Sequence, residues 1–224
     1  MRPLIYLHGF NSTPASAKAQ ATLRWMAQHC PHVRVYIPPL PVTPAATVDA
    51  IDELLHEVCD DLSYIKKPPL GDTSAQPCAP VFMGSSMGGF YANYFAQKYG
   101  GKAVLINPAV YPHRLLAAFL GPQINPHTGE TYTLRKQHMI ELQALMVDPM
   151  TRPQQRMVLL QTGDETLDYR EAADYYAASA CHVEQGGDHS FCHFENWLPA
   201  IAQFLEIDSH EENAGTNDKK APKP

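Results

Sequence analysis

A serine flanked by glycines stands between an apolar segment and a helix-forming segment, and it constrains the possible folds more than any other feature of this sequence. Residues 81–83 predict a strand, residues 84–88 read Gly-Ser-Ser-Met-Gly, and a helix is predicted to about residue 99. Two glycines let the backbone turn sharply, so that the central serine, Ser86, is raised above the edge of a sheet in strained backbone geometry. The pattern predicts Ser86 as a nucleophile on a strand–turn–helix unit.

The rest of the chain repeats the alternation of strand and helix. Short apolar segments predict strands at residues 4–7, 33–37, 103–106, 157–161 and 182–184. Helix-forming segments lie at residues 15–29, 46–64, 170–180 and 194–205. Strands that alternate with helices of about ten to fifteen residues indicate βαβ units, so we expect a compact, mostly parallel sheet with helices on both faces.

One long segment interrupts this alternation. Residues 111–153 contain two helix-like stretches, 115–120 and 134–146, around a turn rich in Gly, Pro and Asn. Because long connections inside compact domains are often lids or binding elements, we expect a small helical cap over Ser86 that shapes a substrate pocket. The length of 224 residues suits a single domain, expected at residues 1–207, and residues 208–224 read as a disordered polar tail.

Composition and charge exclude several functions. The net charge is −6 and Lys and Arg do not cluster, which argues against nucleic acid as a partner. The apolar stretches are too short for membrane insertion, and the N-terminal one is too short for a secretory signal, so we expect a cytoplasmic protein. Five scattered cysteines read as reduced thiols, and the histidines lack metal-ligand spacing, so no metal or other cofactor is expected. The sequence does not predict an oligomeric state.

A serine hydroxyl attacks poorly unless a base removes its proton, so the reading requires a histidine late in the chain. His189 fits best, because it lies in the glycine-rich segment 186–190 that follows the last predicted strand. His193 is the nearest alternative, but we expect it to lie inside the final helix.

The third member of such a site is a carboxylate that accepts a hydrogen bond from the imidazole N–H. Asp164 is the best candidate, since it directly follows the strand predicted at residues 157–161. Asp168 is a rival, and Glu165 a weaker one. A chain order of serine, aspartate and histidine is that of the α/β-hydrolase fold.

Acyl transfer also needs donors for the oxyanion, usually two backbone N–H groups. We expect one from Met87, the residue after the nucleophile, and the other from Phe10, in the loop after the first strand. The His8 side chain at the end of that strand either belongs to the site or merely packs against the loop.

Five segments together resemble the YqiA-like esterase family of bacterial α/β-hydrolases. They are residues 6–12, 84–91, 106–110, 161–165 and 186–189. The resemblance extends from residue 4 to about residue 207, and the chain departs from it in a Pro-rich insertion at residues 66–80 and in the tail. It implies a compact fold whose first strand bears the oxyanion loop, and a serine esterase that hydrolyses short-chain acyl (thio)esters, with a small acyl ester as its partner.

Two other kinds of function stay open at this point. The same fold also serves peptidases, C–C hydrolases and lyases, and a fold can be kept by a binding protein without catalysis. The presence of all three residues in the expected order disfavours the non-catalytic reading.

Overall fold

A six-stranded parallel sheet forms the centre of the computed structural model, which describes residues 2–59 and 79–208. In spatial order the strands are β2 (Val35–Tyr36), β1 (Leu4–Leu7), β3 (Val81–Ser85), β4 (Ala103–Ile106), β7 (Arg156–Gln161) and β8 (Ala180–Glu184). All neighbouring pairs run parallel. The predicted α/β class is therefore confirmed. The insertion at residues 66–78 and the tail from residue 209 lie outside the described residues.

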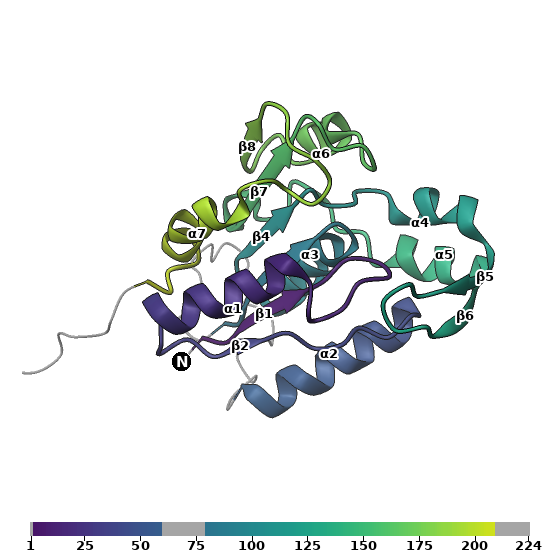
Figure 1. Cartoon of the computed structure of the whole chain (residues 1–224), viewed down its shortest axis with the longest axis horizontal. Helices are drawn as coiled ribbons and strands as arrows, with labels where there is room; N and C mark the ends of the chain where they lie inside the picture. The colour runs from purple at the N-terminus through teal and green to yellow at the C-terminus, as the bar shows by residue number, and fades with distance from the viewer. Residues whose placement is uncertain (1, 60–78, 209–224) are drawn as a thin grey trace, which may run out of the picture.

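Helices cover both faces of this sheet, as the continuous apolar strands require. Helices α1 (Ala17–His29) and α7 (Leu198–Leu205) pack on one face, and α2 (Pro44–Val58), α3 (Met87–Tyr99) and α6 (Tyr169–Tyr175) on the other (Figure 1). Side chains alternate between the two cores with the strand period of two: Leu4 and Tyr6 face α1, whereas Ile5 and Leu7 face α2 and α3. The two faces of one sheet thus contribute to two separate hydrophobic cores.

Several element boundaries differ from the predicted ones, most clearly at three places. The helix predicted at 46–64 begins at Pro44 and ends at Val58. Its N-terminus is capped by Thr43, whose side chain accepts a hydrogen bond from Ala46 N. The helix predicted at 170–180 ends at Tyr175, because Ala180 pairs with Met157 as the start of β8. His193 was expected inside the last helix, but it precedes the 3-10 turn Phe194–Trp197 in a left-handed conformation, with φ of 59°.

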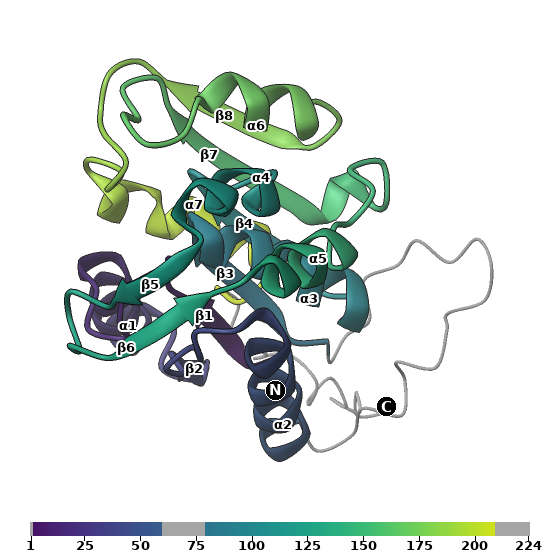
Figure 2. The same cartoon turned by 90° about the vertical axis from the view of Figure 1, so that its right-hand side faces the viewer.

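The segment predicted to form a cap, residues 111–153, has helical turns near the two expected stretches and an unexpected hairpin. Its helices are α4 (Pro112–Leu115), the 3-10 turn Leu116–Phe119 and α5 (Lys136–Ala144). Between them β5 (Gly121–Ile124) pairs antiparallel with β6 (Thr131–Leu134), where the sequence suggested only a turn. Figure 2 shows this hairpin reaching across to the loop that follows β1.

The strand order places a site between β1 and β3. From β1 the chain crosses to β2 on one side, then returns and adds β3, β4, β7 and β8 on the other. Such a reversal opens a crevice at the carboxyl ends of the two central strands, where ligands bind in open α/β sheets. The loop after β1 and the turn after β3 meet there. No helix in the ranges 2–59 and 79–208 is both long enough and apolar enough to cross a membrane.

Candidate active site

Ser86 occupies a tight turn between β3 and α3. Its backbone has φ of 56° and ψ of −120°, a region that residues with a Cβ rarely adopt. The flanking glycines are sterically required: a Cβ on Gly84 would lie 2.1 Å from the carbonyl oxygen of Gly88, and one on Gly88 would lie 1.9 Å from that of Leu7. The strain at Ser86 is thus imposed by its neighbours, as the sequence pattern predicted.

Asp164 and His189 meet at the carboxyl ends of β7 and β8. His189 Nδ1 lies 2.9 Å from both carboxylate oxygens of Asp164. The Asp164 side chain is only 2% exposed, against 24% for His189. Asp164 Oδ1 also accepts hydrogen bonds from the backbone N–H groups of Thr166, at 2.9 Å, and Leu167, at 2.8 Å. The carboxylate is therefore held from two sides.

These contacts determine the charge of Asp164. Burial alone would raise the pKa of its carboxyl, but the hydrogen bonds from His189, Leu167 and Thr166 outweigh that effect and lower the pKa below its usual value. The ionised carboxylate of Asp164 accepts a hydrogen bond from His189 Nδ1, which therefore carries the ring proton. The other ring nitrogen, Nε2, is then the basic one.

The rival candidates have other partners. Asp168 is exposed, accepts a hydrogen bond from Arg170 N at the start of α6, and forms an ion pair with the Arg170 side chain at 2.6 Å. Glu165 accepts a hydrogen bond from the backbone N–H of His189 at 3.0 Å. Of the carboxylates considered, only Asp164 reaches the imidazole ring.

Ser86 and His189 both contact the segment that follows β4. Ser86 N donates to Ile106 O at 3.0 Å, and Ala109 N donates to Ser86 O at 3.1 Å. On the other side, Asn107 Nδ2 lies 3.4 Å from His189 O. Within the described part of the chain, the Ser86 hydroxyl makes no hydrogen bond to His189 Nε2; such contacts often tighten only when substrate binds.

The loop after β1 lies directly against Ser86. A Cβ on Gly9 would be 3.5 Å from Ser86 Cβ and 4.0 Å from its hydroxyl oxygen. Among the described residues, the backbone N–H groups of Phe10 and Met87 have no hydrogen-bond acceptor. Two donors are thus available beside the hydroxyl, at the positions expected for an oxyanion hole.

His8 ties this loop to its neighbour. Its Nδ1 lies 3.1 Å from Gly9 O, and its Nε2 accepts from Leu40 N at 3.3 Å. Burial lowers the pKa of His8, only partly opposed by the contact with Gly9 O, so the ring is neutral with its proton on Nδ1. Of the two roles left open for His8, these contacts favour packing against the loop.

Gln161, which the sequence analysis did not single out, holds the loop that carries His189. Its Oε1 accepts from Asp188 N at 3.2 Å and from Cys192 N at 2.8 Å. Its Nε2 donates to Cys192 O at 2.9 Å and to Glu184 Oε2 at 2.8 Å. The buried amide thus joins both ends of the segment that presents His189.

Asn107 is a second residue of this kind. Its Oδ1 accepts from Gln161 N at 3.0 Å, and its Nδ2 donates to Asp188 O at 3.1 Å. Both amide side chains are almost fully buried. The sequence could have indicated both residues, because each is a polar residue at the end of an apolar strand. A polar side chain buried there needs a hydrogen-bond partner.

A small cavity begins beside the two free N–H groups and continues under the cap. Its volume is about 50 Å³. The lining residues come from the loop after β1, the segment before α2, α3 and the cap: His8, Gly9, Phe10, Asn11, Ser12, Leu40, Pro41, Val42, Met87, Tyr91, Leu116, Asn125, Tyr132, Leu134 and Leu142. Ser86 and His189 are not among the lining residues, but Gly9 and Met87, which are neighbours of Ser86, are.

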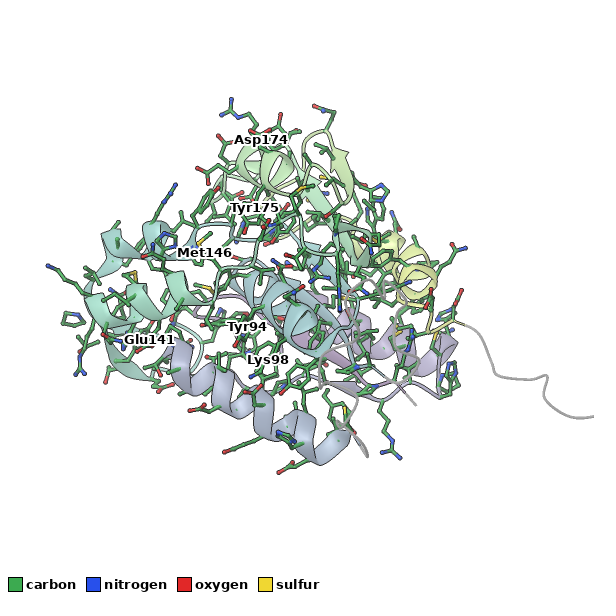
Figure 3. The ribbon with its side chains drawn as sticks, turned by 180° about the vertical axis from the view of Figure 1, so that it is seen from behind. Tyr94, Lys98, Glu141, Met146, Asp174 and Tyr175 are labelled. Atoms are coloured by element: carbon green, nitrogen blue, oxygen red, sulfur yellow. The ribbon has the colours of Figure 1, made fainter. Side chains whose placement is uncertain are left out.

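A second, larger cavity lies on the far side of α3. It has a volume of about 380 Å³. Three of its lining residues, Tyr94, Gln97 and Lys98, belong to α3, and the others follow α5: Met146, Val147, Asp148 and Thr151. Figure 3 shows Tyr94, Lys98 and Met146 together on the back of the molecule. Its lining within the described residues includes neither serine nor histidine. The size of a cavity alone therefore does not identify the site. In the described ranges, no group of three His, Cys, Asp or Glu side chains is placed to hold a metal ion.

Comparison with known proteins agrees with the fold and with the motifs. The family profile described as Uncharacterised protein family (UPF0227) matches residues 3–206. The chain belongs to this family. The UPF0227 match corresponds to the YqiA-like family that the motifs resemble.

Solved structures similar to this UPF0227 member share its α/β-hydrolase fold. Est1E from Butyrivibrio proteoclasticus, solved with ferulic acid bound, has 15% identity and a TM-score of 0.63, over 93% of this chain and 89% of Est1E. Alpha/beta hydrolase domain-containing protein 10 from mouse has 13% identity and a TM-score of 0.61, over 92% of this chain and 90% of the mouse protein. At such identities the likeness establishes the fold alone.

Proposed function

We propose that this protein is a serine hydrolase that cleaves short-chain acyl esters or thioesters. The observation that carries the proposal is the contact of His189 Nδ1 with both oxygens of the buried Asp164, 2.9 Å each, on the sheet edge where Ser86 is raised. A base fixed in this tautomer presents Nε2 to a hydroxyl nucleophile.

The reaction follows from these positions. Ser86 Oγ attacks the ester carbonyl while His189 Nε2 takes its proton. The carbonyl oxygen becomes an oxyanion and accepts hydrogen bonds from Phe10 N and Met87 N. His189 then returns the proton to the leaving alcohol or thiol as the C–O or C–S bond breaks. Water, activated by His189, hydrolyses the acyl group from Ser86 and restores the enzyme.

The size of the acyl group is inferred from the cavity beside the oxyanion donors. A single water needs roughly 10–15 Å³ of such volume. A cavity of about 50 Å³ has room for only a few heavy atoms. Short acyl chains fit this space without movement of the cap.

The test is chemical labelling and kinetics at the serine. A fluorophosphonate probe should label the wild-type protein and Ser85→Ala but not Ser86→Ala, because only Ser86 carries its hydroxyl at the turn. On p-nitrophenyl esters of increasing chain length, Ser86→Ala should lose hydrolysis and Ser85→Ala should keep most of it. Circular dichroism checks that both variants fold. Equal loss in the two variants would remove Ser86 from the mechanism.

A further inference from the structure

The lining of the cavity combines apolar side chains with a few amide and hydroxyl groups and the imidazole of His8. Asn125, at the end of β5, is among its lining residues and is only 7% exposed. Asn125 Oδ1 accepts hydrogen bonds from His127 N at 2.9 Å and Thr128 N at 3.3 Å. These two donors fix the orientation of the amide, so that its NH₂ group is the arm left over.

The NH₂ group of Asn125 has no acceptor among the described residues. The residue as a whole is only 7% exposed, but Nδ2 is not one of the completely enclosed polar atoms without a partner, so it keeps some accessible surface. A donor without an acceptor in the protein needs an oxygen from water or from a ligand, and it costs free energy where neither can supply one. The position of Asn125 in the lining makes the cavity the place from which that oxygen would come.

Asn11, in the loop after β1, has a similar arrangement. Its Oδ1 accepts a hydrogen bond from the Tyr132 hydroxyl at 2.7 Å, which again leaves an NH₂ group as the free arm. Asn11 and Tyr132 both line the cavity. Two amides, one from the loop after β1 and one from the hairpin, are therefore oriented as donors.

The charge of the cavity excludes a carboxylate as the ligand. The lining contains no lysine, arginine or acidic residue, and its one histidine, His8, is held neutral by burial. Transfer of a carboxylate into such surroundings without a cation is costly. An uncharged oxygen that accepts hydrogen bonds satisfies the amide donors without that cost.

We infer that the cavity takes short acyl chains that carry an uncharged oxygen, as in hydroxy-, alkoxy- or oxo-acyl esters, and that Asn125 Nδ2 donates to this oxygen. The inference rests on the proposed ester hydrolysis and names its substrate class. The acyl half enters because the cavity starts at Gly9, Phe10 and Met87, beside the oxyanion donors that hold its carbonyl. No step is added to the reaction.

The experiment compares two esters of nearly equal size with the full-length protein. 4-Nitrophenyl methoxyacetate differs from 4-nitrophenyl butyrate by one oxygen in place of a methylene group. Each kcat/KM is divided by the rate of hydroxide-catalysed hydrolysis of the same ester, which removes the difference in intrinsic reactivity. The wild-type protein should prefer the methoxyacetate by roughly two- to twelvefold, the range of one neutral hydrogen bond.

Asn125→Asp is the variant that isolates the donor. It keeps an oxygen for His127 N and Thr128 N but replaces the NH₂ group with an acceptor, so the normalised preference should fall to about one or below. An added charge near the oxyanion slows both esters alike and cancels in this ratio. Asn196→Asp, an exposed residue of the turn Phe194–Trp197, makes the same chemical change elsewhere and should keep the wild-type preference.

The outcomes separate this inference from the proposed function. Hydrolysis of both esters with a normalised ratio of one overturns the substrate class and leaves the esterase, and this holds even if Asn125→Asp does not fold. A preference that Asn125→Asp retains overturns the role of Asn125. A preference that appears only between 2-methoxyethyl acetate and butyl acetate assigns the cavity to the alcohol half and overturns the acyl assignment. Folded protein that hydrolyses none of these esters overturns the proposed function itself.

Discussion

Asp164 and Asp168 carry the same carboxylate four residues apart, in different surroundings. The Asp164 side chain is buried and receives hydrogen bonds from the His189 ring and from two backbone N–H groups. Asp168 lies in solvent and pairs with Arg170. An exposed ion pair of this kind contributes little to stability, whereas a buried carboxylate that orients an imidazole determines which nitrogen is basic.

We therefore predict that Asp164→Asn lowers kcat for short esters by about 10³- to 10⁴-fold, since the amide no longer fixes the tautomer of His189. KM should change little. Asp168→Asn is the matched control and should stay within about threefold of the wild-type protein. If Asp168→Asn were the more damaging variant, Asp168 would replace Asp164 as the acid of the site.

Gln161 gives a second prediction at this scale. In Gln161→Glu the side chain can still accept from Asp188 N, but it no longer donates to Cys192 O and places a second carboxylate beside Glu184. The loop that carries His189 should shift, and kcat should fall at least tenfold with KM within about threefold, because near-attack geometry is sensitive to small displacements.

The double variant Gln161→Glu, Glu184→Gln is the control for this prediction. It removes the repulsion and returns a donor to the pair, so it should recover part of kcat. Loss of thermal stability without a change in kcat per folded molecule would limit Gln161 to a structural role.

At the level of elements, the hairpin β5–β6 and the loop after β1 form one unit. The Tyr132 hydroxyl donates to Asn11 Oδ1 at 2.7 Å, and its ring packs edge-on against Phe10, with 6.3 Å between ring centres. Asn11 has φ of 53°, a conformation that needs support in a residue with a Cβ. The hairpin thus supports the loop whose Phe10 N is the proposed oxyanion donor.

We predict that Tyr132→Phe lowers kcat for butyrate esters by about three- to tenfold, because the ring contact remains while the hydrogen bond that steadies the loop is lost. Steady-state kinetics on p-nitrophenyl butyrate measures the effect. Tyr94→Phe, on the far side of α3, makes the same change away from the loop and should have no effect. An equal loss of kcat in both variants would show that the hydrogen bond from the hairpin has no specific effect on the proposed oxyanion donors.

The hairpin also marks a limit of prediction from sequence. The turn at Ser86 is encoded within five residues, and the candidates Asp164 and His189 follow from their positions after strands, so their contact was predictable although their catalytic roles stay predictions. Strands β5 and β6 are four residues each and, among the described residues, pair with no strand but each other, so little local periodicity identifies them. Gln161 and Asn107 hold the His189 loop through hydrogen bonds that form only when the ends of particular strands lie side by side. A single sequence does not specify which strands become neighbours.

For the whole molecule, the parallel sheet brings every part of the site to one edge. The loops after β1, β3, β4, β7 and β8 all lie there, so protonation of a group that holds one of these loops in place affects the site. His8 is the relevant histidine, because its neutral ring accepts from Leu40 N and supports the loop that carries Phe10.

The last prediction is that the free energy of unfolding decreases at acidic pH because His8 becomes protonated. Burial lowers the pKa of His8 in the folded protein, so near pH 6.5 the unfolded chain binds a proton that the folded chain does not. The stabilisation is complete above this pH and decreases as the pH falls towards the folded pKa. Asp164, whose folded pKa is also lowered, adds a second loss below about pH 4.

Urea denaturation at about pH 7.5 and about pH 5.5 measures the contribution of His8, which is at most about 1.4 kcal/mol over this interval for one proton. His8→Asn should be less stable than the wild-type protein at the higher pH but should lose less on acidification. His127→Asn removes an exposed histidine and should keep the wild-type pH dependence. A wild-type slope in His8→Asn would assign the acid sensitivity to other groups, of which His113, whose pKa burial also lowers, is the first to examine.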